Sequence, residues 1–183
     1  INLQKGGPAI NLTKGNGQPL QQIYIGLGWD VDAAGVDLDA SVACLQQNDK
    51  LLDHSFFVFY NNLKSPDGSV VHSGDNRTGQ GDGDDESVRI NLAGIPPPVV
   101  KILLIVSINN PQGRTFVNVK NAFFRIVDSA TNQETHRCNL SAGQGGQTSC
   151  LVFAELLRQP SGWVVNPVCV PVPSLEAIVN NFS

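Results

Sequence analysis

Carboxylates and glycines are interspersed through residues 61–86, which read NNLKSPDGSVVHSGDNRTGQGDGDDE. Carboxylates crowded in this way repel one another unless a cation lies among them, and hard cations such as Ca²⁺ take oxygen ligands. Glycine allows a loop to fold back on itself and bring carbonyl oxygens close. We therefore expect a calcium site here, although a solvated, partly disordered loop would have the same composition. The acidic residues of this loop are Asp67, Asp75, Asp82, Asp84, Asp85 and Glu86.

A second acidic segment, residues 36–45 (VDLDASVACL), alternates apolar and polar residues as a strand does. A strand places Asp37 and Asp39 on one face, about 7 Å apart, so both could reach one ion or two neighbouring ions. An exposed polar face is the other interpretation of this pattern. Because Asp30 and the acidic loop add further carboxylates, we predict a shared site for one or two Ca²⁺ ions. The predicted ligands are Asp30, Asp37, Asp39, Asn61, Asn62, Asp67, Asp75, Asp82, Asp84, Asp85 and Glu86.

The net charge of −4 is unevenly distributed along the chain. Residues 30–86 contain twelve acidic and three basic residues, whereas the rest contains four acidic and nine basic residues, the basic ones scattered singly. Scattered basic residues without aromatic neighbours argue against nucleic acid as a partner. Cysteines at 44, 138, 150 and 169 form no CxxC pair, which excludes a zinc site of the usual spacing. We expect buried free thiols, with disulfides only if the protein is exported.

The length of 183 residues suits one domain, and 18 glycines and 11 prolines favour a turn-rich β fold. We predict an all-β, two-sheet β-sandwich with a long acidic calcium-binding loop and a short C-terminal helix. Ser174 is the expected N-cap of that helix. The stretch 116–127 reads as a strand, with a helix as the alternative. The predicted strands are 22–29, 36–45, 54–60, 69–71, 87–92, 99–108, 116–127, 135–140, 148–156 and 162–168, of which 54–60 and 99–108 are expected to be central.

Motifs for other chemistry do not fit this sequence. Residues 75–86 have the length of an EF-hand loop, but Arg77, Gly79 and Gln80 break its pattern and strands flank it. Neither a Walker A sequence nor GxGxxG after a strand occurs, and the histidines at 54, 72 and 136 are dispersed. We therefore predict no catalytic residue and no nucleotide site. No apolar run approaches the roughly 20 residues that span a bilayer. The chain starts at Ile1 and contains no Met, so we expect at least an initiator residue before it.

The sequence resembles the TerD family of tellurium-resistance and stress-response proteins over about residues 2–165. The central block, FVFYNNLKSPDGSVVHSGDNRTGQGDGDDE at 57–86, is nearly the family signature itself. The tail departs from the family, in which a glycine-rich, tyrosine-containing segment commonly follows the tryptophan strand. Here prolines at 167, 171 and 173 and Cys169 intervene. The other matching segments are LQKG at 3–6, GLGWD at 26–30, DLDAS at 37–41, NAFFRIVD at 121–128 and LVFAEL at 151–156, with Trp163 after them.

The resemblance implies a β-sandwich that binds calcium through DLDAS and the acidic loop, without enzymatic activity. It implies a bacterial stress context in the cytoplasm or at a membrane-associated complex, with calcium and other stress-response proteins as partners. We divide the chain into a TerD-like domain at 1–168 and a proline-containing tail with a short helix at 169–183. The alternatives are a calcium-dependent self-assembling structural protein, which forms homo-oligomers, and a metal-dependent enzyme acting on a phosphorylated ligand.

Overall fold

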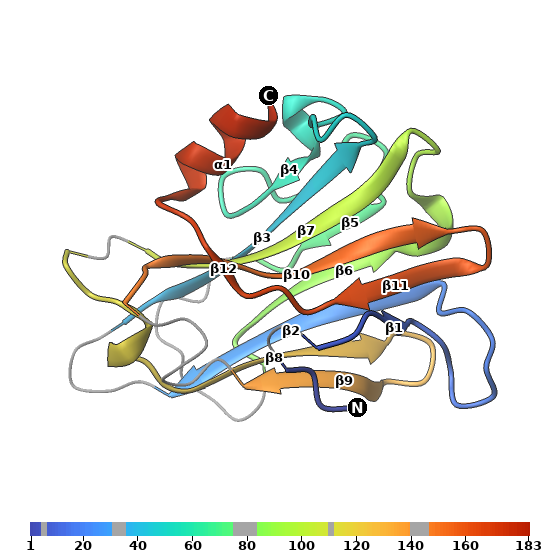
Figure 1. Cartoon of the computed structure of the whole chain (residues 1–183), viewed down its shortest axis with the longest axis horizontal. Coiled ribbons are helices and arrows are strands. Elements are labelled where there is room, and N and C mark those ends of the chain that lie inside the picture. Colours follow the sequence, from blue (N-terminus) through green and yellow to red (C-terminus); the bar gives the residue numbers. More distant parts are fainter. Residues whose placement is uncertain (5–6, 31–35, 75–83, 110–111, 140–146) are drawn as a thin grey trace.

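The fold is a sandwich of two antiparallel sheets, which confirms the predicted class (Figure 1). It is given by a computed structural model that describes residues 1–4, 7–30, 36–74, 84–109, 112–139 and 147–183. The helices of these described ranges include none that is both long and apolar enough to cross a bilayer. All pairings between named strands are antiparallel, as expected where short turns connect the strands.

The larger sheet has the order β1-β11-β10-β7-β3-β4, with β12 also paired to β10. Strand β7 (Val99–Ile108) lies between β3 and β10, so the nearly continuous apolar run predicted to be central is central. Ile102 and Leu104 are buried in the core between the sheets, and Leu103 and Ile105 are buried in a cluster on the other face, so an unbroken apolar sequence is favoured. The other strands of this sheet are β1 (Ile10–Asn11), β3 (Leu38–Gln46), β4 (Phe57–Val58), β10 (Cys150–Gln159), β11 (Gly162–Asn166) and β12 (Val170–Pro171).

The smaller sheet has the order β5-β6-β2-β8-β9. Strand β2 (Gln22–Asp30) is its centre and ends at the acidic residue Asp30. The region 116–127, predicted as a strand with a helix as the alternative, begins with a short 3₁₀ turn, η3 (Phe116–Asn118), and continues as strand β8 from Lys120. The remaining strands are β5 (Val70–His72), β6 (Glu86–Asn91), β8 (Lys120–Asp128) and β9 (Gln133–Asn139).

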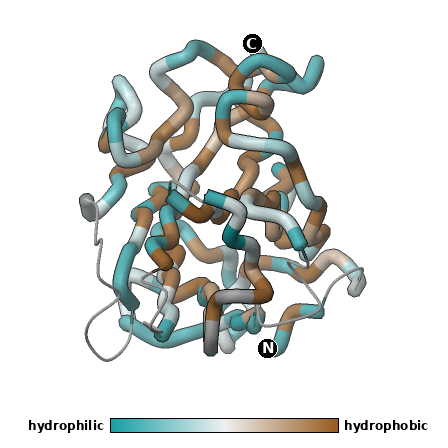
Figure 2. The backbone as a smooth tube through the Cα atoms, turned by 90° about the vertical axis from the view of Figure 1, so that its left-hand side faces the viewer, coloured by the Kyte–Doolittle hydropathy of each residue, from teal (hydrophilic) through white to brown (hydrophobic). Residues whose placement is uncertain are grey.

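The main core fills the space between the sheets, where hydrophobic residues gather (Figure 2). Alternate residues of β2 point inward, among them the fully buried Ile23 and Leu27. The rings of Phe124 and Phe153 meet across the sheets with centroids 3.9 Å apart. Each buried side chain of this size contributes about 1.5–3 kcal/mol, so this layer holds the two sheets together.

A second apolar cluster lies on the outer face of the larger sheet, beneath α1 (Leu175–Phe182). Ile178 of the helix is buried in the same cluster as Leu45 of β3 and Leu103 of β7. The helix begins as predicted, because the Ser174 hydroxyl accepts the amide hydrogen of Ala177 at 3.1 Å. With β12 paired to β10, the tail packs onto the sheet; the domain division at residue 168 stays a prediction.

The prediction of a central strand at 54–60 is wrong. A 3₁₀ turn, η1 (His54–Phe56), comes first, because the Asp53 carboxylate caps it by accepting the Ser55 amide hydrogen. The two-residue strand β4 then forms the edge of the larger sheet. A tight turn closes directly afterwards through paired backbone hydrogen bonds between Phe59 and Asn62. The run is apolar because its aromatic side chains pack at the sheet edge, not because it is central.

The four cysteines are free and buried, as predicted. Burial raises the pKa of the Cys44 thiol to about 12, with a smaller contribution from the Asp67 carboxylate. Burial likewise raises the pKa of the Cys150 thiol to about 11. Because the thiolate is the reactive form, these two thiols are poor nucleophiles at neutral pH.

Candidate functional site

Strand register brings several acidic residues from both sheets to one end of the sandwich. In the smaller sheet, the end of β2 lies beside the start of β6, with Leu27 opposite Glu86. In the larger sheet, β3 starts where β7 ends, with Asp39 opposite Ser107. A hydrogen bond between Ala40 and Glu86 joins these two regions. We call this region, formed by Asp30, Asp37, Asp39, Asp84, Asp85 and Glu86, the carboxylate end.

Glu86 and His72 complete the open edge of β3. Strand β4 pairs with β3 only at positions 42 and 43, so it leaves both backbone groups of Ala40 without a strand partner. The Glu86 carboxylate accepts the Ala40 amide hydrogen at 2.9 Å, and His72 Nε2 contacts the Ala40 carbonyl oxygen at 3.1 Å. Because the Gly74 amide donates to His72 Nδ1, the ring carries its hydrogen on Nε2 and donates it to that carbonyl. Two buried side chains of the smaller sheet thus replace a missing neighbouring strand.

Asp85 is the described residue at which crowding of negative charge is most evident. Its Oδ2 accepts the Trp29 amide hydrogen at 3.0 Å, which by itself favours the ionised form. Burial nevertheless raises the pKa of Asp85, and the neighbouring carboxylates Asp84, Asp30 and Glu86 raise it further. A raised pKa means that negative charge is held here at a cost, and a bound cation would remove that cost.

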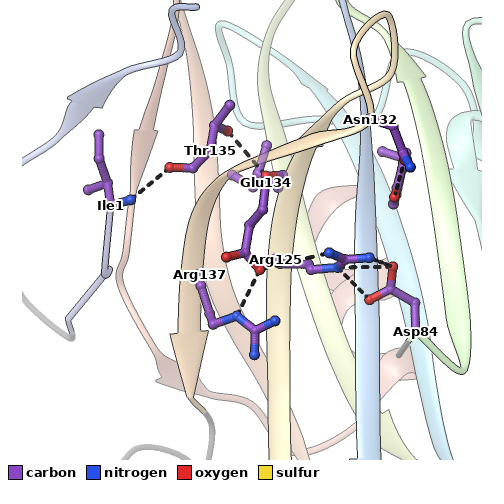
Figure 3. A network of polar contacts seen from close by, with 9 residues as sticks. Ile1, Asp84, Arg125, Asn132, Glu134, Thr135 and Arg137 are labelled. Atoms are coloured by element: carbon purple, nitrogen blue, oxygen red, sulfur yellow. Dashed lines mark hydrogen bonds and ion pairs between the residues drawn. The ribbon is translucent and has the colours of Figure 1, made fainter. Parts of the chain in front are cut away.

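Asp84 is paired with Arg125 of β8 on the outer face of the smaller sheet (Figure 3). Both carboxylate oxygens accept from the guanidinium, at distances of 2.8–3.1 Å, and Asp84 raises the pKa of Arg125. Glu134 of β9 lies 3.9 Å from Arg125 and accepts from Arg137 at 2.8 Å, which extends the charges into a ladder across the sheet. The predicted ligand Asp84 is therefore held by a cation of the protein itself.

Gly26 makes room for the Asp84 carboxylate. A Cβ atom at position 26 would lie only 2.3 Å from Asp84 Cγ and Oδ1, well inside any allowed contact. Sequence reasoning missed Arg125 and this close approach, since Arg125 stands 41 residues after Asp84. A glycine inside a strand often marks a close approach of another group, so Gly26 was the signal available in the sequence.

Asp37 and Asp39 belong to the larger sheet. Asp39 is only 1% exposed, so the alternative of an exposed polar face is wrong for this residue. Asp37 directly precedes β3, where its Oδ2 accepts from the side-chain amide of Asn109 at 3.2 Å. Its backbone carbonyl oxygen accepts the Asn109 amide hydrogen at 2.8 Å, which fixes the residue at the start of the strand.

Three predicted ligands have turn-forming roles or positions. Asn61 is exposed at the tip of the turn that follows β4, and the side-chain amide of Asn62 donates to the Ser55 and Phe57 carbonyl oxygens. The Asp67 carboxylate closes its own turn by accepting hydrogen bonds from the Ser65 hydroxyl, the Ser69 hydroxyl and the Ser69 backbone amide. Burial acts to raise the pKa of Asp67, but these hydrogen bonds outweigh it and lower that pKa.

The ligand atoms of this donor set suit Ca²⁺, but the described side chains do not form a complete coordination shell. All the side chains gathered at the carboxylate end offer oxygen atoms, which Ca²⁺ prefers. Within the described ranges, no three His, Cys, Asp or Glu side chains converge closely enough to hold a metal ion. Two further predicted ligands, Asp75 and Asp82, lie outside those ranges. The ligand set therefore stays a prediction.

Comparison with known proteins relates the whole chain to one family. A family model described as the TerD domain matches residues 1–182. The tellurium resistance protein TerD of Alcaligenes sp is 43% identical over 168 residues, which cover 89% of this chain and 86% of that protein. General stress protein 16U of Bacillus subtilis (strain 168) is 40% identical over 169 residues, with 89% and 86% covered.

Solved structures share the fold. A crystal structure of a homologue of telluride resistance protein from Streptomyces coelicolor A3(2) superposes with a TM-score of 0.70 at 21% identity. The superposition covers 85% of this chain and 92% of that one. A second crystal structure, of a protein of unknown function, gives a TM-score of 0.72 at 23% identity, with 85% and 91% covered. At these identities the likeness bears on the fold alone.

Proposed function

The chain belongs to the TerD family of tellurium-resistance and stress-response proteins, and from this premise we propose that it is a non-enzymatic Ca²⁺-binding module. The proposal concerns what the module does at the carboxylate end. Acidic residues from both sheets lie at this end of the sandwich, and we expect a cation to be bound among them.

The crowding of carboxylates at this end is the observation that carries the proposal. Asp84, Asp85 and Glu86 are consecutive, and the strand register places them beside the end of β2 at Asp30. Burial and these neighbouring carboxylates raise the pKa of Asp85. Two unit charges 4 Å apart near a protein surface interact by about 4 kcal/mol, so a few such neighbours are costly to hold together. The buried carboxylates of Asp39 and Glu86 add to the same region. A divalent cation among oxygen ligands would turn this repulsion into attraction.

The residues expected to hold Ca²⁺ come from both layers of the sandwich. Asp30, Asp85 and Glu86 belong to the smaller sheet, and Asp37 and Asp39 to the larger one. Bound Ca²⁺ would neutralise part of this negative charge. Magnesium should substitute poorly, because it requires near-octahedral geometry and retains water ligands. One or two ions suit the number of carboxylates.

Thermal unfolding in Ca²⁺ and in chelator tests the proposal. At a Ca²⁺ concentration 100 times Kd, binding to the folded chain alone should stabilise it by about 2.7 kcal/mol. Asp39→Asn should reduce this gain. Asp49→Asn is the matched control, because Asp49 is exposed and pairs with Lys101 instead. Equal melting temperatures in millimolar Ca²⁺ and in chelator would refute calcium binding.

We further propose a scaffold role in a stress-response assembly, in the cytoplasm or at a membrane-associated complex. Homo-oligomers built by adding strand to strand are a weaker candidate, because both edges of the smaller sheet are partly covered. Residues 1–3 run beside β9 through hydrogen bonds with Arg137, and residues 63–65 run beside β5. Covered edges resist pairing with another chain. Size-exclusion chromatography with and without Ca²⁺ tests this: a Ca²⁺-dependent shift to a larger species would favour self-assembly.

A further inference from the structure

A hollow of about 330 Å³ lies between the outer face of the larger sheet and the start of α1. The strand β12 leads into α1 at this side of the larger sheet (Figure 1). Its volume falls at the lower end of the range typical of small-molecule sites. The residues that line it are Asp39, Tyr60, Ser107, Ile108, Asn109, Ser149, Cys150, Pro173, Ser174, Leu175 and Glu176.

A buried hydroxyl without a protein partner points to a ligand in this hollow. Ser107 is 5% exposed, and its Oγ makes no hydrogen bond with any described residue. A buried polar group left unsatisfied costs about 1–3 kcal/mol, so such groups normally have a partner. Because Ser107 lines the hollow, a molecule bound there can supply that partner. The Ser149 hydroxyl in the same wall offers a second contact point.

The charges of the wall select the kind of ligand. Asp39 lies in the wall and Glu176 is exposed at its edge, whereas the described lining residues include no lysine, arginine or histidine. The N-terminus of α1 adds roughly half a positive charge, which two carboxylates outweigh. Anions are therefore disfavoured. The apolar side chains of Cys150 and Leu175, which belong to the outer-face cluster, suit a short carbon chain between polar ends.

We propose that this hollow binds a small aliphatic amine. An ammonium group would interact with Asp39 and Glu176 and donate to the Ser107 hydroxyl. The methylene chain would pack on the apolar wall. The volume corresponds to roughly ten waters, so a ligand with at most about ten non-hydrogen atoms fits. This site is distinct in ligand from the proposed calcium site, although Asp39 stands at the border of both.

Calorimetric titration of the metal-free protein in chelator tests the inference with three probes that share a four-carbon chain. These are 1,4-diaminobutane, butane-1,4-diol and succinate, with charges of +2, 0 and −2. We expect saturable 1:1 binding of the diamine, and no measurable heat from the diol or succinate at the same concentrations. Preferential binding of the diol or succinate, or no binding of any probe, would overturn the proposal.

Variants distinguish the hollow from general attraction to an acidic protein. Because Glu176 is exposed, Glu176→Gln should weaken diamine binding about threefold, and Ser107→Ala about fivefold, the effect of one hydrogen bond. Asp49→Asn removes an exposed carboxylate elsewhere and should leave the affinity unchanged. Equal weakening by Glu176→Gln and Asp49→Asn would show nonspecific attraction and refute the site. Because Ca²⁺ is absent, failure here leaves the calcium proposal untouched, and failure of calcium binding leaves this test intact.

Discussion

Gly26→Ala should destabilise the protein by displacing the Asp84 carboxylate from Arg125. The added Cβ would lie 2.3–2.4 Å from three carboxylate atoms of Asp84, whereas ordinary contacts begin at 3.4 Å. The carboxylate must therefore move by about 1 Å, which is enough to break hydrogen bonds of 2.8 Å to Arg125. Gly26 lies in the centre of β2, so the backbone cannot easily yield instead.

The expected cost follows from the partial burial of the pair. The side chain of Asp84 is 12% exposed and that of Arg125 is 25% exposed, so solvent screens the pair only in part. Exposed ion pairs contribute about 0–1 kcal/mol, and hydrogen bonds to charged groups about 1.5–3 kcal/mol. Replacing a strand glycine by alanine returns about 0.5–1 kcal/mol of backbone entropy. The net loss should be about 1–2 kcal/mol, a fall in Tm of roughly 2–8 °C.

A double-mutant cycle measured by urea denaturation in chelator separates this contact from other effects. Asp84→Ala removes the obstructing carboxylate, so Gly26→Ala in that background should be neutral or slightly stabilising. Gly15→Ala is the control, because nothing lies within 4 Å of a Cβ at that position. If Gly26→Ala costs the same free energy with and without Asp84, the close approach is not the reason for the glycine and the reasoning is refuted.

Three further predictions concern the buried acids and a histidine. Glu86→Ala should lower the free energy of unfolding by about 1–3 kcal/mol, because the Ala40 amide loses its hydrogen-bond acceptor. Glu86→Gln keeps an acceptor oxygen and should cost less. Equal losses in the two variants would contradict this role of Glu86. Asp85→Asn should raise the Tm in chelator at neutral pH. The raised pKa of Asp85 means that its protonated form gives stability that is lost as pH rises through the folded-state pKa, and Asn carries no charge at any pH. A lower Tm would refute this prediction. Burial, with the N-terminal charge, lowers the pKa of His136 to about 4, so stability should be full above pH 6.5 and fall towards pH 4. His136→Leu should flatten that fall in pH-dependent melting, and an unchanged slope would contradict the assignment.

The sequence predicted those parts of the fold that depend on local pattern. Alternation placed β2 and β3 within one or two residues of their ends, and Ser174 marked the start of α1. The run at 54–60 was misjudged because apolar content does not distinguish a central strand from aromatic packing at an edge. The capping carboxylate of Asp53 decided the local structure there.

The residue types of the candidate site could be predicted from the sequence, but the contacts between those residues could not. Residue types alone indicated a site shared by acids of two segments. The register places Asp30, Asp39 and Glu86 at one end of the sandwich, and the shared ion site stays a prediction. That Glu86 and His72 would complete the edge of β3 depends on the shortness of β4, which no local pattern encodes. Long-range pairs of this kind arise from tertiary packing.

Calorimetric titration of Ca²⁺ into the metal-free protein tests the central claim most directly. The account predicts saturable binding of one or two ions per chain, lost or weakened in Asp39→Asn and retained in Asp49→Asn, with Mg²⁺ a poor substitute. Absence of saturable heat at millimolar Ca²⁺, equal Ca²⁺ affinity in both variants, or binding of Mg²⁺ as tight as that of Ca²⁺ would contradict it.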